Sequence, residues 1–366
     1  GNIFMTGHFE DTVTFDTQSV TSAGGKDVYV VKYNSSGAVV WLTHAGGTSD
    51  DESRGIAVDN NNVFITGRFA GSATFGTSNL ISTAVSNDVF IAQLNPSGVF
   101  QWALSAGGSG SDDAYDASVD GAGNCYVAGY FHDTISFGTD TLMSSGNDDA
   151  FIAKYNSSGT ALWAKRAGGV NGDRAYSVAA DVSGKVYITG SFEDTASFNS
   201  TNLISNGDKD IFVAEYNSSG VLQWAMRAGG SGFDRGYGIT TDQSGNVYTT
   251  GVFEQTASFG TLPVISSGLL DFFLTKISAP VGMIELNVEE SCIHVYPNPA
   301  DSKVHVEYKD IANSKVAVYD VTGQKIFEKS NCSLVDLSAF NNGLYFIVLT
   351  DMRKNITYSK TELLNK

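Results

Sequence analysis

The side chains best suited to bind a ligand occupy positions that vary within an otherwise repetitive chain. One such position, between Gly and Phe, holds His8, Arg68, Tyr130, Ser191 and Val252, and a second, before Ala-Gly-Gly, holds His44, Ser105, Arg166 and Arg227. Imidazole, guanidinium and phenol groups recognise ligands through hydrogen bonds, charge and ring contacts. If these positions share a rim they can contact one ligand, whereas neutral drift on a solvated face is the alternative. The candidate ligand-facing residues are His8, Arg68, Tyr130, His44, Arg166 and Arg227.

Motifs typical of catalysis are missing from the sequence. It contains no Gly-x-Ser-x-Gly, His-Glu-x-x-His, phosphate-binding loop or Gly-x-Gly-x-x-Gly. His8 and His132 fall near equivalent ends of the repeat, but no third metal ligand accompanies them. We therefore expect no catalytic residues, no metal centre and no enzymatic activity.

Aspartate recurs at fixed positions of the repeat. Asp59, Asp120, Asp181 and Asp242 occupy one turn position. Recurrence favours a structural role, in which each carboxylate accepts hydrogen bonds from backbone amides of its turn. Repeated calcium sites are the alternative, although the turn lacks the alternating oxygen ligands of an EF-hand loop. We expect no cofactor, with calcium as the open possibility.

The repeat that carries these residues has a period of 61. Asp27, Asp88, Asp149, Asp210 and Asp271 are spaced by it, as are Trp41, Trp102, Trp163 and Trp224. Each unit holds four short segments with alternating apolar residues, joined by turns such as Asn217-Ser-Ser-Gly220. Four antiparallel strands per unit make one blade of a β-propeller. A parallel β-helix competes, but its rungs are shorter and lack regular hairpin turns.

The first strand of each unit is rich in small residues, as in Ser177-Val-Ala-Ala-Asp181, which fits the crowded innermost position of a blade. The pattern at 236–251 resembles the bacterial β-propeller repeat often labelled seven-bladed, and the resemblance extends over residues 1–278. It implies an all-β propeller placed outside the cytoplasm and implies no activity. Five blades are recognisable, the first and last incomplete. Their pieces overlap, so we expect that upstream sequence is missing and that the full ring has more blades.

A different pattern begins after the repeats. Residues 279–290 read as a linker, and residues 291–366 alternate in short bursts typical of a small antiparallel, Ig-like β-sandwich. Val295-Tyr-Pro-Asn-Pro-Ala300, Val318-Tyr-Asp-Val-Thr-Gly-Gln324 and Asn342-Gly-Leu-Tyr-Phe346 resemble the C-terminal sorting domain of the type IX secretion system of Bacteroidetes. The motif match marks Pro297, Asn298, Pro299, Gly343 and Tyr345. The resemblance implies recognition by the type IX translocon and removal by a sorting peptidase, followed by release or by attachment to surface lipopolysaccharide.

Composition limits the possible partners. The net charge is −17, with 28 acidic and 13 basic residues before position 281, so nucleic acid is a poor partner. No stretch approaches the roughly 20 apolar residues of a membrane span. Three cysteines are too few for a disulfide scaffold, although Cys292 and Cys332 could pair.

Three functional hypotheses remain open. The first is a secreted or cell-surface propeller that binds or adheres without catalysis, with carbohydrate or a surface protein as its ligand. The second is an exported enzyme acting on polysaccharide, with its site at the propeller mouth or in missing upstream sequence. The third is a structural spacer within a larger surface protein. A close, non-repeating pair of carboxylates at the mouth would favour the enzyme.

Overall fold

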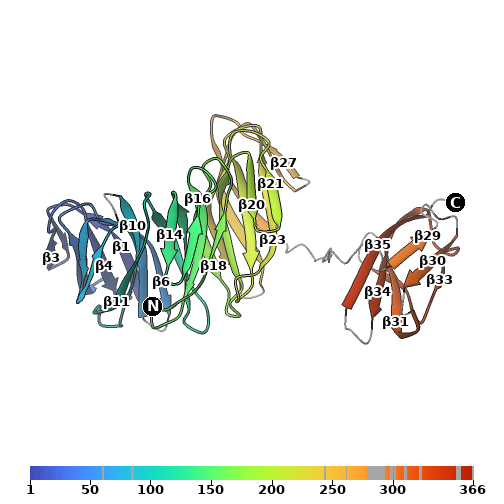
Figure 1. Cartoon of the computed structure of the whole chain (residues 1–366), viewed down its shortest axis with the longest axis horizontal. Coiled ribbons are helices and arrows are strands. Elements are labelled where there is room, and N and C mark those ends of the chain that lie inside the picture. The colour runs from blue at the N-terminus through green and yellow to red at the C-terminus, as the bar shows by residue number, and fades with distance from the viewer. Residues whose placement is uncertain are drawn as a thin grey trace. The chain divides into compact units, whose positions relative to one another are not determined.

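The protein is nearly all β in the computed structural model (Figure 1). The structure describes residues 1–59, 62–83, 86–242, 245–260, 262–277, 293–296, 300, 302–308, 311–320, 324–351 and 356–364. Two compact units are present, Gly1–Ser278 and Ala279–Lys366. The linker predicted at 279–290 lies outside the described residues.

The long strands of the first unit form five antiparallel sheets that follow one another along the chain, and each of these is one blade. The first blade contains β1 (Ile3–Phe9), β4 (Asp27–Tyr33) and β5 (Val39–Gly47). The second contains β6 (Glu52–Asp59), β7 (Asn62–Ala70), β10 (Asn87–Leu94) and β11 (Phe100–Ala106). The third contains β12 (Asp113–Val119), β13 (Cys125–Phe131), β16 (Asp149–Tyr155) and β17 (Ala161–Ala167).

The fourth blade contains β18 (Arg174–Ala180), β19 (Val186–Phe192), β22 (Asp210–Tyr216) and β23 (Leu222–Gly230). The last contains β24 (Arg235–Thr241), β25 (Val247–Phe253) and β28 (Asp271–Ile277). Strand order within each complete blade follows the chain: tight turns join the first strand to the second and the third to the fourth, and a longer connection joins the second to the third. Figure 1 shows the blades side by side in chain order. This repetition of four-stranded sheets is the β-propeller-like fold predicted from the sequence.

The small-residue strands lie innermost, as predicted. β6, β12, β18 and β24 are the first strands of successive blades, and each lies beside the next. The crowding is visible at Gly55, where a Cβ atom would lie 2.7 Å from the Cα of Asp116 in the next blade. The middle strands are apolar without alternation: every residue of β13, β16, β19 and β22 is buried. A sheet covered on both faces by its neighbours has this composition.

An outer hairpin connects the second and third strands of each blade. The hairpins are β2–β3 (Thr12–Phe15, Gln18–Thr21), β8–β9 (Ser72–Phe75, Ser78–Ile81), β14–β15 (Thr134–Phe137, Asp140–Met143), β20–β21 (Thr195–Phe198, Thr201–Ile204) and β26–β27 (Thr256–Phe259, Leu262–Ile265). β8 pairs with β5 of the preceding blade, and β26 pairs with β23 in the same way. These hairpins thus form a clamp between blades.

The recurring turn aspartates bond to their own turns. Asp120 Oδ1 accepts hydrogen bonds from the amides of Ala122 and Asn124, at 2.9 and 3.0 Å. Asp181 Oδ1 accepts in the same manner from Ser183 and Lys185. These bonds confirm the structural role predicted for this position.

The second unit contains two antiparallel sheets around one core. The sheets are β29 (Ile293–Tyr296), β30 (Lys303–Tyr308) and β33 (Leu334–Asp336), and β32 (Lys325–Ser330), β31 (Ser314–Tyr319), β34 (Gly343–Asp351) and β35 (Ile356–Leu364). A 3₁₀ turn, η1 (Ile311–Asn313), precedes β31. Val304 and Val335 of the first sheet pack in one cluster with Val316 and Ile347 of the second. Two sheets that share a core form a β-sandwich.

Candidate ligand site at the inner rim

Each innermost strand carries a β-bulge near its start. The register with the second strand shifts at Ser53/Gly55, Ala114/Asp116, Ala175/Ser177 and Gly236/Gly238. The extra residue is Arg54, Tyr115, Tyr176 or Tyr237, and these four are spaced by the 61-residue period. A bulge bends its strand and redirects a side chain. The bulge therefore places one large side chain per blade at the same rim of the inner strands.

These side chains form a continuous strip. The Arg54 guanidinium lies 5.2 Å from the centre of the Tyr115 ring, and the Tyr115 and Tyr176 centres are 5.1 Å apart. The Tyr176 and Tyr237 centres are 5.4 Å apart, and Tyr237 is 46% exposed. We call Arg54, Tyr115, Tyr176 and Tyr237 the inner-rim strip. Tyrosines in contact present an amphipathic surface, with apolar rings and hydroxyls that can hydrogen-bond.

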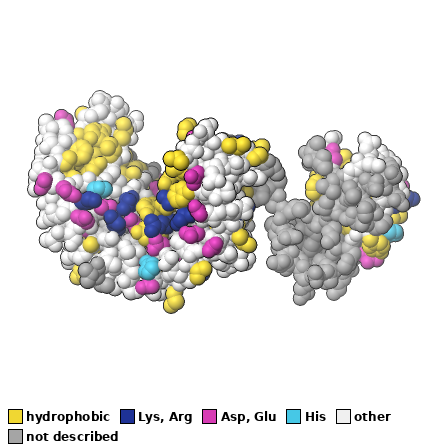
Figure 2. Space-filling model, turned by 90° about the horizontal axis from the view of Figure 1, so that it is seen from above, with side chains coloured by type: hydrophobic (Ala, Val, Ile, Leu, Met, Phe, Trp, Pro, Cys, Tyr) yellow, Lys and Arg dark blue, Asp and Glu magenta, His cyan; other side chains and the backbone are white. Residues whose placement is uncertain are grey.

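A second row of charged residues borders the strip. Its members are the first residues of the four innermost strands, Glu52, Asp113, Arg174 and Arg235. The Arg174 guanidinium stacks 4.2 Å from the centre of the Tyr130 ring, and its Nε donates to Asp148 at 3.0 Å. Figure 2 shows several Lys and Arg side chains grouped in the middle of the visible face of the first unit, with Asp and Glu beside them.

The two carboxylates of this row share their cations. Glu52 is within 3.1 Å of Arg54 and Arg68 and 2.9 Å of Lys26, and Asp113 is 3.1 Å from Arg54 and 3.8 Å from Arg68. Burial works to raise the pKa of Glu52, but hydrogen bonds from Lys26 and Arg68 and the charges of Arg68 and Arg54 outweigh it and lower that pKa to about 2. Burial raises the pKa of Asp113 to about 6 against the same arginines. Asp113 Oδ1 has no hydrogen-bond partner.

Two of the six predicted ligand-facing residues lie in this site. Arg68 and Tyr130 lie on the second strands of the second and third blades, directly opposite Glu52 and Asp113 in the register. The Tyr130 ring is 5.7 Å from that of Tyr115. The second-strand position therefore lies beside the strip: Tyr130 contacts Tyr115, and Arg68 shares Glu52 and Asp113 with Arg54.

The other four predicted residues have different surroundings. Arg166 Nη1 is 2.6 Å from the buried Asp149 and also bonds to Ser145, and Arg227 Nη1 is 3.3 Å from the buried Asp210. These arginines compensate carboxylates inside their own blades. His8 and His44 are exposed on the first blade, and His44 packs 6.5 Å from the Phe9 ring.

The strip residues are not among those predicted from the sequence to face a ligand. Their spacing of 61 was available, and so was the occurrence of a large aromatic residue within a strand of small residues. The bulge that turns these residues toward the rim depends on strand pairing and has no sequence motif of its own here.

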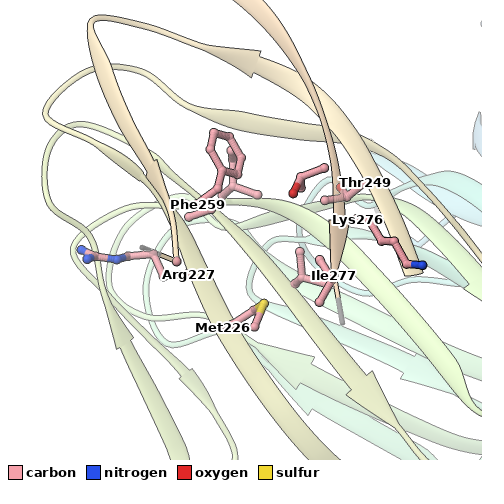
Figure 3. A pocket seen from close by; sticks show the side chains of 11 residues that line it. Met226, Arg227, Thr249, Phe259, Lys276 and Ile277 are labelled. Atoms are coloured by element: carbon pink, nitrogen blue, oxygen red, sulfur yellow. The ribbon is translucent and has the colours of Figure 1, made fainter. Parts of the chain in front are cut away.

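Two cavities lie between blades, away from the strip. One of about 190 Å³, between the fourth and fifth blades, is bordered by Met226, Phe259 and Ile277, while Arg227 and Lys276 at its margin extend outward (Figure 3). Its lining includes two threonines, Thr249 and Thr275, and Thr249 already donates to the Gly238 carbonyl at 3.0 Å. The other, about 570 Å³ between the third and fourth blades, is bordered in part by Arg166. The smaller cavity is mostly apolar, whereas Lys165, Ser197 and Asn199 also border the larger one, whose Arg166 is already paired with Asp149.

Among the described residues, no three His, Cys, Asp or Glu side chains come together as a metal site. No helix with the length and apolar character of a membrane span occurs in that part of the chain.

The predicted sorting residues divide between described and undescribed positions. Pro297, Asn298 and Pro299 lie outside the described residues, as does Cys292. Gly343 begins β34, and Tyr345 is buried in the sandwich core with its hydroxyl donating to the Asn341 carbonyl at 2.8 Å. Tyr345 thus fixes the turn into β34. Cys332 is a buried free thiol.

Comparison with known families identifies both parts of the chain. A model described as a secretion system C-terminal sorting domain matches residues 294–361, and a model described as a β-propeller repeat matches residues 223–252. The chain carries a type IX sorting domain behind β-propeller repeats, as the sequence resemblance implied. Such a domain indicates export, with a secreted or cell-surface location.

Relatives of known sequence or structure are distant. An uncharacterized WD repeat-containing protein of Acanthamoeba polyphaga mimivirus is 26% identical over 224 residues, which cover 50% of this chain and 16% of the viral protein. PorZ, an essential surface component of the type IX secretion system of Porphyromonas gingivalis, aligns over 92% of this chain and 64% of its own at 10% identity and a TM-score of 0.19. The extracellular domain of BT4673 from B. thetaiotaomicron aligns over 99% and 56% at 12% identity and a TM-score of 0.23. TM-scores this low support no argument about function.

Proposed function

We propose that this exported β-propeller protein is a non-catalytic binding module and that its ligand lies along the inner-rim strip. The observation that carries the proposal is the row of Arg54, Tyr115, Tyr176 and Tyr237, placed at one rim by four equivalent bulges. A role confined to propeller stability does not require partly exposed tyrosines in contact over three blades. Partly exposed tyrosines are typical of binding surfaces, because they supply rigid contact area at a low cost in conformational entropy.

Binding to an array of immobilised polysaccharides and matrix proteins tests this proposal. The wild-type chain is compared with a Tyr176→Ala/Tyr237→Ala variant and with a Leu162→Ala control, a change on the exposed part of β17. We expect the double variant to lose at least tenfold in affinity for whatever the wild type binds, and the control to lose none. Binding to nothing on the array, or binding that the double variant retains, would contradict the proposal and favour the spacer hypothesis.

One observation favours the second candidate function, an enzyme acting on polysaccharide. Glu52 and Asp113 are each 3.1 Å from Arg54 Nη2, so their nearest carboxylate oxygens are at most 3.1 + 3.1 = 6.2 Å apart. Their pKa values diverge to about 2 and about 6, and two carboxyls with such different pKa values can divide the roles of base and acid. Both are at most 4% exposed and are held by arginines, which argues for a structural pair.

The two candidates differ in what happens to a bound sugar. A binding module leaves an oligosaccharide intact, whereas an enzyme produces new reducing ends. Prolonged incubation with each polysaccharide that binds, followed by a reducing-end assay, separates them. Cleavage that Asp113→Asn abolishes would replace the binding proposal with the enzymatic one.

A further inference from the structure

The charged row beside the strip changes sign along the blades. Its equivalent positions are Glu52, Asp113, Arg174 and Arg235, so carboxylates occupy the second and third blades and guanidiniums the fourth and fifth. The propeller repeats carry most of the net charge of −17. Two successive arginines at one rim of an acidic protein therefore form a local exception.

Arg235 differs from the other arginines of the site in its surroundings. Arg54, Arg68 and Arg174 each lie within ion-pair distance of a carboxylate. Among the described residues, no carboxylate lies within 4.0 Å of the Arg235 guanidinium. Its Nε is buried without a hydrogen-bond partner. Arg235 is thus a cation with unused donors.

Aromatic rings fix the position of this cation. The guanidinium carbon lies 4.5 Å from the centre of the Phe233 ring and 5.0 Å from that of Tyr176, and Nη1 donates to the Tyr237 hydroxyl at 3.1 Å. Cation–π contacts hold a guanidinium by its face, and because Nε is buried, the donors that can reach an external acceptor are those of the terminal Nη1 and Nη2 atoms. A guanidinium fork is suited to carboxylate and sulfate groups, with which it forms paired, charge-assisted hydrogen bonds.

We infer that Arg235 is the anion-binding residue of the inner-rim strip and that the ligand is an acidic polysaccharide. This inference rests on the proposed function. The strip presents one tyrosine in each of three consecutive blades, and this regular spacing fits a polymer built from a repeating unit. Tyrosine rings pack against the apolar faces of sugar rings, and Arg235 binds the carboxylate or sulfate of one unit.

The charge balance favours a polysaccharide with widely spaced acidic groups. Exposed charges more than about 8 Å away are largely screened at physiological ionic strength, so the net charge of the propeller does not prevent one local ion pair. A polymer with an anion on every unit would also approach Glu52 and Asp113 at the other end of the row. Hyaluronan, with one carboxylate per disaccharide, is therefore the first probe.

Binding of the full chain to hyaluronan, dextran sulfate and neutral dextran tests the inference. We expect hyaluronan to bind more tightly than dextran, and Arg235→Gln to weaken hyaluronan binding by about tenfold or more, the size of one lost charge-assisted hydrogen bond. Tight binding of dextran sulfate that Arg235→Gln abolishes would support Arg235 as the anion-binding residue, with sulfate as the bound group, and would overturn the preference for widely spaced acidic groups. Lys185→Gln is the control, because Lys185 lies at the end of its blade opposite the strip. It directly precedes β19, whereas Ser191, which pairs with Arg174 of the charged row, lies near the other end of that strand. Equal binding of dextran and hyaluronan, or an Arg235→Gln variant that binds as wild type, would overturn the inference.

Inhibition of the wild type provides a test that needs no variant. Free glucuronate should compete with hyaluronan, and glucose at equal concentration should not. Arg235→Lys retains the charge without the fork and should bind with intermediate affinity. Binding of only neutral glycans or proteins, lost in Tyr176→Ala/Tyr237→Ala, would overturn this inference and leave the proposed function standing.

Discussion

The indole Nε1 of Trp163 donates a hydrogen bond of 3.1 Å to the backbone carbonyl of Ser218 in the next blade. The same bond joins Trp102 to Ser157 at 3.2 Å and Trp41 to Pro96 at 3.0 Å. Trp224 instead donates to Glu215 of its own blade at 2.8 Å. The repeated tryptophan thus links three successive pairs of blades through a turn carbonyl.

Loss of this link should destabilise the propeller. Trp163 is 7% exposed and packs against Tyr126 with ring centres 6.0 Å apart. Trp163→Phe removes the hydrogen bond, while the Ser218 carbonyl still accepts from Lys154 Nζ at 3.1 Å, so we expect a loss of about 0.5–1.5 kcal/mol in the free energy of unfolding. Urea unfolding followed by circular dichroism measures it. The exposed neighbour Leu162 provides the control: if Leu162→Ala costs as much, the indole bond has no special role.

A glycine beside a buried carboxylate should tolerate no side chain. At Gly107 a Cβ atom would lie 2.0 Å from Asp88 Cγ, and Asp88 is 1% exposed. Gly107→Ala must displace this carboxylate, and overpacking of this kind costs about 1–3 kcal/mol. Gly268→Ala is the matched control, since no atom lies within 4 Å of its Cβ position. Equal thermal midpoints for the two variants would show that Asp88 moves freely.

The architecture was predictable because the same sequence pattern recurs in every repeat. Strands and turns recur at a period of 61 residues. An ambiguous strand or turn assignment in one repeat is therefore resolved by the equivalent residues of the others. The small residues of the first strands correctly indicated the innermost position. The clamp between blades was not predicted, because the pairing of Ala73 with Gly47 joins different repeats and no local pattern encodes it.

The candidate site was only partly predictable. The variable position in the second strand led to Arg68 and Tyr130, which do lie at the strip. The variable position before Ala-Gly-Gly led to Arg166 and Arg227, whose partners are the recurrent Asp149 and Asp210. Variation alone could not distinguish these cases, because it does not show which side of the strand faces a buried carboxylate.

Buried aspartates should make the propeller more stable in mild acid. Burial raises the pKa of Asp51 to about 7, of Asp112 to about 8 and of Asp173 to about 7, with repulsion from Asp27, Asp88 and Asp149 adding to it. An unfolded aspartate has a pKa of about 3.9. Between about pH 4 and 8 the folded state therefore binds more protons than the unfolded state, and the free energy of unfolding falls as pH rises. The contribution is complete below about pH 4 and is lost as pH rises through the folded pKa values.

Urea unfolding at pH 5.5, 6.5 and 7.5 measures this slope. Asp112→Asn imitates the neutral acid, since Asp112 Oδ2 has no hydrogen-bond partner and can be replaced by an amide. We expect the variant to have a shallower pH dependence than wild type, by up to about 1.4 kcal/mol per pH unit. Asp208→Asn, at an exposed position, should leave the slope unchanged. A wild-type protein that gains stability from pH 5.5 to 7.5 would contradict the prediction.

Export should depend on the C-terminal unit and not on the strip. The sorting-domain match covers residues 294–361, so deletion of 291–366 removes it whole. We expect the truncated protein to accumulate in the periplasm of a type IX-competent host, while the wild type reaches the cell surface or medium. Arg235→Gln in the full chain should be exported at the wild-type level, because the strip lies in the other compact unit. Fractionation and immunoblotting measure both, and continued secretion of the truncated protein would refute the assignment of the tail.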